Sequence, residues 1–365
     1  MKSKTLFLIL FFQFFISCSS YEKYKNNLDF YNDPDLFHRS MQKLTDIIVY
    51  DIFSPPVASR IYVYPSVAAY EVLINDYPNY ESLSGKINGL NSIPKPDFNK
   101  EYSFPIASIY AFITVGKDLI FSENKINSFQ EELLNEFQEN GVPKDILNRS
   151  KEYGLEVANH IKKWYDEDNY KQTRSFPKYT IQRDINESWK PTPPDYMEGI
   201  EPHWNKIRTL VVDSSNQFMI EPPPEFSLEK NSKFYKDLLE VYEIGNNLTD
   251  EQKNMASFWD CNPYVSHHKG HAMFATKKIT PGGHWIGITK IVSKKADLNL
   301  METIYTYTMV SIGLFDAFII CWDEKWRSIL IRPETVNNKY LDDDCIPFLQ
   351  PPPFPEYTSG HSVIS

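Results

Sequence analysis

The chain has 365 residues, of which 42% are hydrophobic and 15% aromatic, and its formal net charge is −10. The acidic balance, without any broad basic stripe, argues against a nucleic-acid-binding surface. The aromatic content disfavours intrinsic disorder, and the length allows one large domain or two of ordinary size.

The first residues have the pattern of a targeting segment. Lys2 and Lys4 form a short basic region, and the apolar run from Leu6 to Ile16 that follows is too short to span a bilayer. This favours a signal peptide over a transmembrane helix, and we expect residues 1–17 to be removed.

A cysteine stands where a bacterial lipoprotein cleavage box requires one, because Phe15-Ile16-Ser17-Cys18 is similar to that box. On this interpretation Cys18 is lipidated and residues 18–34 form a tether. Ser19 rather than Asp after Cys18 favours the outer membrane, so the protein is expected outside the cytoplasm. The alternative is an ordinary secretory signal with an incidental cysteine.

Apolar residues then recur at three- and four-residue spacing, which predicts amphipathic helices. Arg60 and Glu71 interrupt one of these stripes; they would pair inside a bundle or, as is commoner, lie on a solvated face. A connection rich in Pro, Asn and Gly separates the second helix from the third. The predicted helices cover 35–53, 55–73, 105–121, 123–139 and 143–166, and together they would form a first helical bundle over 35–170.

Prolines interrupt residues 171–231, which predicts a long ordered connection rather than a helix. A second helical bundle is expected over 232–365, with helices at 232–248 and 250–259. The longest apolar helix candidate, 298–322, contains Glu302 and Asp316. Its uncharged part after Thr303 has only twelve residues, whereas a membrane span needs roughly 20 apolar residues. This apolar run therefore predicts a buried bundle helix. No strand-rich region or internal repeat is evident, so the fold class is all-α.

The candidate functional residues are concentrated between Lys325 and His361. Lys325 and Arg332 are seven residues apart, which on one helix places both cations on one face about 10 Å apart. Pro333 disfavours helical geometry at Arg332, so a helix should end there. Ser359-Gly360-His361 follows a proline-rich loop and predicts the first turn of another helix, whose free N–H groups can bind an anion. His361 is a natural proton donor or acceptor.

This segment resembles the first two signature motifs of the vanadium-dependent haloperoxidase and type-2 phosphatidic acid phosphatase superfamily, Lys-x6-Arg-Pro and Pro-Ser-Gly-His. Thr358 replaces the usual proline of the second motif. The stretches 189–194 and 201–204 also resemble bacterial lipoprotein-like haloperoxidase homologues. The matching motif residues are Lys325, Arg332, Pro333, Ser359, Gly360 and His361.

The resemblance implies helical bundles with an oxyanion site in the second bundle. In the haloperoxidases, bound vanadate accepts peroxide and oxidises halide, and the oxygen-holding groups would be Lys325, Arg332, Ser359 and Gly360, with His361 as acid-base. In the phosphatases the same groups hold the phosphate of an ester substrate, without a cofactor. The extracytoplasmic location and the proline-rich middle favour the haloperoxidase branch.

A third motif of this superfamily, Ser-Arg-x5-His, is not found in the 365 residues. It normally supplies another arginine and the histidine that bonds to vanadium or attacks phosphorus. A hypothesis of a different class is therefore a truncated, catalytically incompetent fragment, or an oxyanion-binding lipoprotein.

Asp316 lies nine residues before Lys325 in the apolar run, where a carboxylate needs a partner. It could orient Lys325 or a cation from the third-motif segment, or it could have a capping or surface role.

Other polar clusters give weaker signals. His267, His268 and His271 have one helical i, i+4 pair, but the zinc-protease glutamate is missing, so a polar loop without metal is favoured. His284 could line a cleft or only pack. The run 342–344 is interpreted as an acidic surface loop rather than a calcium site. The cysteines 261, 321 and 345 predict no disulfide framework.

Overall fold

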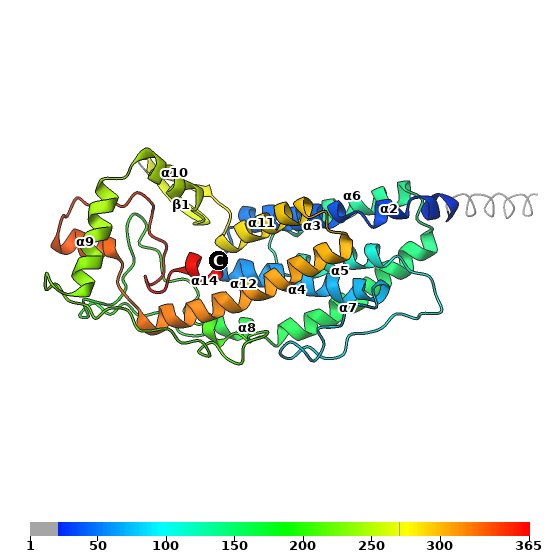
Figure 1. The fold of residues 1–365 in the computed structure, drawn as a ribbon, viewed down its shortest axis with the longest axis horizontal. Coiled ribbons are helices and arrows are strands. Elements are labelled where there is room, and N and C mark those ends of the chain that lie inside the picture. Colours follow the sequence, from blue (N-terminus) through cyan, green and yellow to red (C-terminus); the bar gives the residue numbers. More distant parts are fainter. Residues whose placement is uncertain (1–20, 270) are drawn as a thin grey trace, which may run out of the picture. The chain divides into compact units, whose positions relative to one another are not determined.

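The computed structural model describes residues 21–269 and 271–365, so the predicted signal peptide and Cys18 lie outside the described residues. The described chain is mostly helical, which confirms the all-α class, and Figure 1 shows the order of its elements. Backbone contacts divide it into two compact units. Of the described residues, unit 1 comprises 21–51, 61–165 and 286–311, and unit 2 comprises 52–60, 166–269, 271–285 and 312–365.

The units interleave along the chain, whereas the sequence analysis divided it into consecutive segments. Four of the described helices contribute residues to both units, because the unit boundaries fall inside them. Those helices are α4 (Pro55–Leu73), α7 (Lys144–Asp166), α11 (Pro281–Lys295) and α12 (Leu300–Ser328). The predicted domain boundaries stay a prediction.

Unit 1 is built on helices whose apolar stripes face one another. Helix α3 (Pro34–Asp51) packs against α5 (Phe104–Asp118) and α6 (Glu123–Glu139), and Phe37 of α3 contacts Phe112 of α5 with ring centroids 5.0 Å apart. These rings are fully buried, as the three- and four-residue spacing predicts. The unit also contains α2 (Leu28–Tyr31), η1 (Ile74–Asp76) and most of α7 (Lys144–Asp166).

Polar groups buried in unit 1 are hydrogen-bonded. Glu71 is 2% exposed, and its carboxylate accepts from Ser82 Oγ at 2.7 Å and the Leu83 N–H at 2.6 Å. The solvated face expected for Glu71 is therefore wrong, because the carboxylate holds the loop after α4. Within the segment expected to be a tether, Tyr31 is buried, and its hydroxyl donates to the Phe137 carbonyl at 3.0 Å.

Unit 2 carries the proline-rich connection, which buried groups anchor. Arg60 and Asp168 form an ion pair with an N–O distance of 2.7 Å, and both side chains are almost fully buried. Arg60 thus does not lie on a solvated face. Trp189 and Trp204 have no exposed surface. The elements of unit 2 are α8 (Tyr170–Thr173), η2 (Trp204–Lys206), α9 (Lys233–Asn246), α10 (Asp250–Phe258), β1 (Tyr264–Lys269), β2 (Ala272–Lys277), α13 (Pro333–Tyr340) and α14 (Gly360–Ile364).

A strand pair and helix α11 are among the elements that were not expected from the sequence. Strands β1 and β2 pair antiparallel, with Tyr264 opposite Lys277, where a polar loop was predicted. Helix α11 begins at Pro281 and includes Gly282 and Gly283 in its first turn; a proline is favourable at that position, although the glycines weaken the pattern.

Helix α12 is the buried bundle helix that the apolar run predicted. By length and composition it could cross a membrane. Most of its apolar stretch is nevertheless buried inside the protein, and Ile304, Phe315 and Ile319 have no exposed surface. This burial is the pattern of a core helix rather than of a lipid-facing one.

A glycine pair offers a matched test of packing in unit 1. A Cβ at Gly154 in α7 would lie 2.5 Å from the Ala107 carbonyl oxygen of α5, whereas a Cβ at Gly287 in α11 meets nothing within 4 Å. We expect Gly154→Ala to lower the free energy of unfolding by about 1–3 kcal/mol. Gly287→Ala should raise it by about 0.5–1 kcal/mol, because alanine stabilises a helix interior. Chemical denaturation measures both, and equal effects would contradict the close helix approach.

Candidate active site

A cavity of about 890 Å³ lies within unit 2. Apolar side chains and prolines form much of its wall, among them Trp322 and the run 351–354. The residues expected from the two motifs line this one cavity, although they come from three separate segments of the chain. Those residues are Lys325, Arg332, Ser359, Gly360 and His361.

Lys325 lies in the last turn of α12 and is 1% exposed. Its ammonium donates to the carbonyls of Pro355 at 3.0 Å and Glu356 at 3.1 Å. It also lies 4.8 Å from the centroid of the Phe354 ring, a distance at which a cation is attracted to the ring face. Burial is the main cause that lowers the pKa of the Lys325 ammonium from its ordinary 10.5 to about 8, and the nearby Arg332 charge contributes to the same shift.

Arg332 does not share a helix with Lys325, so the prediction that both cations project from one helix face is wrong. Helix α12 ends at Ser328, and Ile329 has a positive φ of 50°. The following strand-like residues bond instead to the proline-rich connection: the Ile331 N–H donates to the Glu187 carbonyl at 2.8 Å. Because of these tertiary hydrogen bonds, the helix ends at Ser328. Pro333 alone would have allowed it to continue to Arg332, four residues further on.

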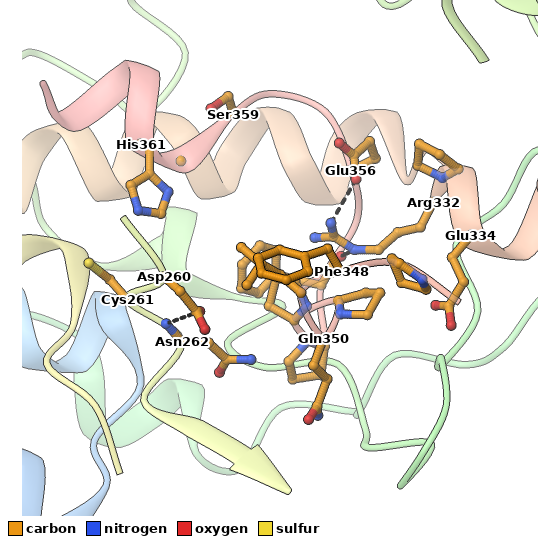
Figure 2. Close-up of a pocket in the computed structure, with 18 of the residues that line it drawn as sticks. Asp260, Cys261, Asn262, Arg332, Glu334, Phe348, Gln350, Glu356, Ser359 and His361 are labelled. Carbon is orange, nitrogen blue, oxygen red and sulfur yellow. Dashed lines mark hydrogen bonds and ion pairs between the residues drawn. The ribbon is translucent and has the colours of Figure 1, made fainter. Parts of the chain in front are cut away.

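Arg332 occupies the N-cap position of α13, with Pro333 as the first helical residue. Its Nε donates to the Phe354 carbonyl at 2.8 Å, and one terminal nitrogen pairs with the Glu356 carboxylate at 2.7 Å. Figure 2 shows this ion pair. Burial lowers the pKa of Arg332, and Glu356 and Glu334 oppose that shift.

Ser359, Gly360 and His361 form the start of α14, which confirms the predicted helical turn. Ser359 is the N-cap, and its Oγ accepts from the Ser362 N–H at 3.2 Å. A Cβ at Gly360 would meet nothing within 4 Å, so the backbone is open there. His361 extends from α14 toward the segment that carries Asp260 and Cys261 (Figure 2). Partial burial of its ring lowers the pKa of His361, although much of the side chain is exposed, and the Trp259 carbonyl partly opposes the shift.

Asp316 caps a loop instead of orienting Lys325. Its carboxylate accepts from the backbone N–H groups of Leu210 and Val211, both at 2.7 Å, and of Val212 at 3.1 Å. The carboxylate is 5% exposed, and these bonds supply the partners that its burial requires. Of the two alternatives left open by the sequence, the contacts match capping.

The remaining candidates lie apart from the site or pack behind its wall. His267 is on β1 and lies 3.2 Å from the Thr276 hydroxyl. No group of three possible metal ligands occurs in the described part of the chain. His284 stacks on Trp259 with centroids 4.8 Å apart, and its Nδ1 lies 3.4 Å from the Cys261 sulfur. Cysteines 261, 321 and 345 are all free.

Phe354 and Glu356 are site residues that the sequence did not indicate. Phe354 faces both cations, with the Arg332 guanidinium 5.0 Å from its ring centroid, and Glu356 is the acidic partner of Arg332. Both lie in the loop between the motifs, where the sequence had no periodicity to indicate which side chains face inward. Their closeness to the second motif was the only signal.

Comparison with solved structures finds similar proteins, among them two bacterial vanadium-dependent haloperoxidases. A structure described as the first bacterial vanadium-dependent iodoperoxidase is 49% identical to this chain, with a TM-score of 0.85, and the match covers 91% of this chain and 78% of that one. Apo and holo forms of a bacterial vanadium-dependent chloroperoxidase are each 16% identical, with TM-scores of 0.60. Those matches cover 85% and 86% of this chain and 75% and 74% of theirs. No family model and no curated protein matches.

The lowered pKa of Lys325 predicts a stability change at alkaline pH. The ammonium has a pKa of about 8 when folded and 10.5 when exposed, so the unfolded chain binds more protons between these values. The free energy of unfolding should therefore fall, as pH is lowered from 10.5 to 8, by at most about 3 kcal/mol from this group. Lys325→Met should remove this component.

The check is the difference between the wild-type and Lys325→Met unfolding free energies across that pH range. Cys321 interacts electrostatically with Lys325, so both proteins carry Cys321→Ala, and the contributions of the tyrosines and of the other cysteines then cancel in the difference. A constant difference would mean that Lys325 keeps its ordinary pKa in the folded protein.

Proposed function

The chain belongs to the vanadium-dependent haloperoxidase family, and from this premise we propose that it oxidises halide with hydrogen peroxide at a vanadate held in the unit 2 cavity. The observation that carries the proposal is the burial of two cations, Lys325 and Arg332, at the wall of the same cavity as the Ser359–His361 helix start. A similar protein is described as an iodoperoxidase, so iodide is the first halide to test.

The donor set at the cavity fits a tetrahedral oxyanion. Within the described residues the Lys325 ammonium donates two of its three hydrogens, and both acceptors are oxygens. Nδ2 of Asn262, which also lines the cavity, is buried without a hydrogen-bond partner in the described chain. Ser359 Oγ accepts two hydrogen bonds and keeps its own proton to donate. Ammonium, guanidinium, hydroxyl and amide groups are the donors that bind oxyanions.

Each residue of the site would have a defined role. Lys325 and Arg332 would neutralise the negative oxygens, and the Ser359 hydroxyl and Gly360 N–H would donate to them. When bound, vanadate supplies the centre at which peroxide is activated toward the halide. Neutral His361, favoured by its lowered pKa, would accept a proton from an oxygen in the cavity and return it. The apolar wall would exclude water and strengthen these interactions.

The phosphatase alternative uses the same donors on a phosphate ester. Phosphate and vanadate present similar tetrahedral oxygens, so the cations alone would hold either. The haloperoxidase proposal is favoured because the similar structures are named as iodo- and chloroperoxidases. Parallel assays of vanadate-dependent iodide oxidation and of p-nitrophenyl phosphate hydrolysis separate the two.

His361 provides the mutational test. His361→Ala should lower the rate of vanadate-dependent iodide oxidation by about 10²–10⁴-fold, because a positioned acid-base contributes on that order. The dissociation constant for orthovanadate should change by less than about tenfold, since the cations remain. The readouts are triiodide absorbance and an equilibrium binding titration.

The matched control is His267→Ala, which changes an exposed histidine of β1 that does not line the cavity. It should leave both quantities unchanged. Full iodide oxidation by His361→Ala would remove His361 from the mechanism.

We further propose an extracytoplasmic lipoprotein anchored through Cys18. The support is the sequence pattern alone: a basic start, a short apolar run and a cysteine in a cleavage-box context. Cys18→Ser should abolish incorporation of labelled palmitate in a bacterial host and release the protein from the membrane fraction. Retention of the label in that variant would contradict the assignment.

A further inference from the structure

Glu356 lies directly beside the pair of buried cations. Its Oε2 is 2.7 Å from a terminal nitrogen of Arg332. A dashed line in Figure 2 marks this ion pair. The Glu356 carboxylate therefore accepts from a guanidinium N–H of Arg332 that could otherwise donate to a bound oxyanion. A carboxylate and a tetrahedral oxyanion both bind a guanidinium through charge-assisted N–H···O bonds.

The two partners of this ion pair are held very differently. The Arg332 side chain is 11% exposed, and it is fixed by the Phe354 carbonyl and ring. The Glu356 side chain is 38% exposed, and in the described chain its carboxylate has Arg332 as its one hydrogen-bond partner. The carboxylate can therefore move into water at low cost, whereas the guanidinium cannot.

The backbone of Glu356 stays in place when its side chain moves. Its N–H donates to the Leu330 carbonyl at 3.0 Å, and its carbonyl accepts from Lys325 at 3.1 Å. A rotation of the side chain thus leaves the segment that holds both cations intact. Displacing the carboxylate from Arg332 therefore requires rotation of the Glu356 side chain only.

Charge explains why such a carboxylate is present. Lys325 and Arg332 bring two positive charges into a buried wall, and an unpaired buried charge is costly. Glu356 neutralises one of them, and Glu334 also acts electrostatically on Arg332. When an oxyanion arrives with its own negative charge, Glu356 becomes a like charge close to it.

We propose that Glu356 is a displaceable counter-ion of the oxyanion site: its carboxylate pairs with Arg332 in the anion-free protein and swings into solvent when the oxyanion binds. Glu356 then weakens anion affinity, because each binding event must break the ion pair. This inference rests on the proposed oxyanion site but not on the redox chemistry. The contrary role, in which Glu356 positions Arg332, predicts the opposite sign.

The test measures dissociation constants for orthovanadate and inorganic phosphate by equilibrium titration. Glu356→Gln keeps the shape and removes the charge, and it should bind both anions about tenfold more tightly, an effect of about 1.4 kcal/mol. Glu356→Ala should also bind more tightly than wild type. Glu356→Asp keeps the charge and should stay within about threefold of wild type.

Glu201→Gln is the matched control. It removes a carboxylate from another Arg–Glu pair of unit 2, with Arg174, and neither residue lines the cavity. Its anion affinities should equal those of wild type. Far-UV circular dichroism and thermal melting of each variant establish that folded protein is compared.

The outcomes separate this inference from the proposed function. Vanadate binding by wild type with equal or weaker binding by Glu356→Gln overturns the counter-ion role and leaves the function standing. Suppose that Glu356→Gln and Glu356→Ala bind phosphate more tightly than wild type, but that wild type shows no vanadate-dependent iodide oxidation. This result supports the counter-ion role of Glu356 and contradicts the proposed haloperoxidase function. Failure of every variant to bind either anion overturns both.

Discussion

The burial of Lys325 and Arg332 is the constraint on which unit 2 depends. Removing two cations from water costs several kcal/mol each unless their hydrogens find acceptors. The segment 354–356 supplies these acceptors as three backbone carbonyls, an aromatic ring and one carboxylate. The cations therefore fix the course of the loop between the motifs, and this loop delivers Ser359 and His361 to the cavity.

The proline-rich connection supports the same arrangement from the other side. It forms backbone hydrogen bonds with the residues between α12 and α13, such as Trp189 N–H to the Ile329 carbonyl at 2.7 Å. These bonds end α12 and turn Arg332 to the start of the next helix. The proline-rich connection has little regular structure, yet it positions Arg332 through these hydrogen bonds. The buried side chains of Trp189 and Trp204 anchor it to the rest of unit 2.

A buried cation pair in an apolar cavity is suited to hold an oxyanion firmly while leaving the acid-base to a more accessible group. Lys325 and Arg332 are nearly inaccessible, whereas His361 is at the start of a short, exposed helix. Affinity and proton transfer would therefore depend on different residues. Glu356, intermediate in exposure, would adjust affinity without touching the proton-transfer group.

The sequence alone determined the helices with strong apolar periodicity, such as 123–139, and the residues of the two motifs, because both depend on local spacing. It also placed a helix start at Ser359, where an N-cap and a following glycine act locally. Only the tertiary structure decided that Arg332 leaves the helix of Lys325, that Asp316 caps a distant loop and that Glu356 pairs with Arg332. These outcomes depend on partners 24 to more than 100 residues away, and such long-range hydrogen bonds leave no periodic pattern in the sequence.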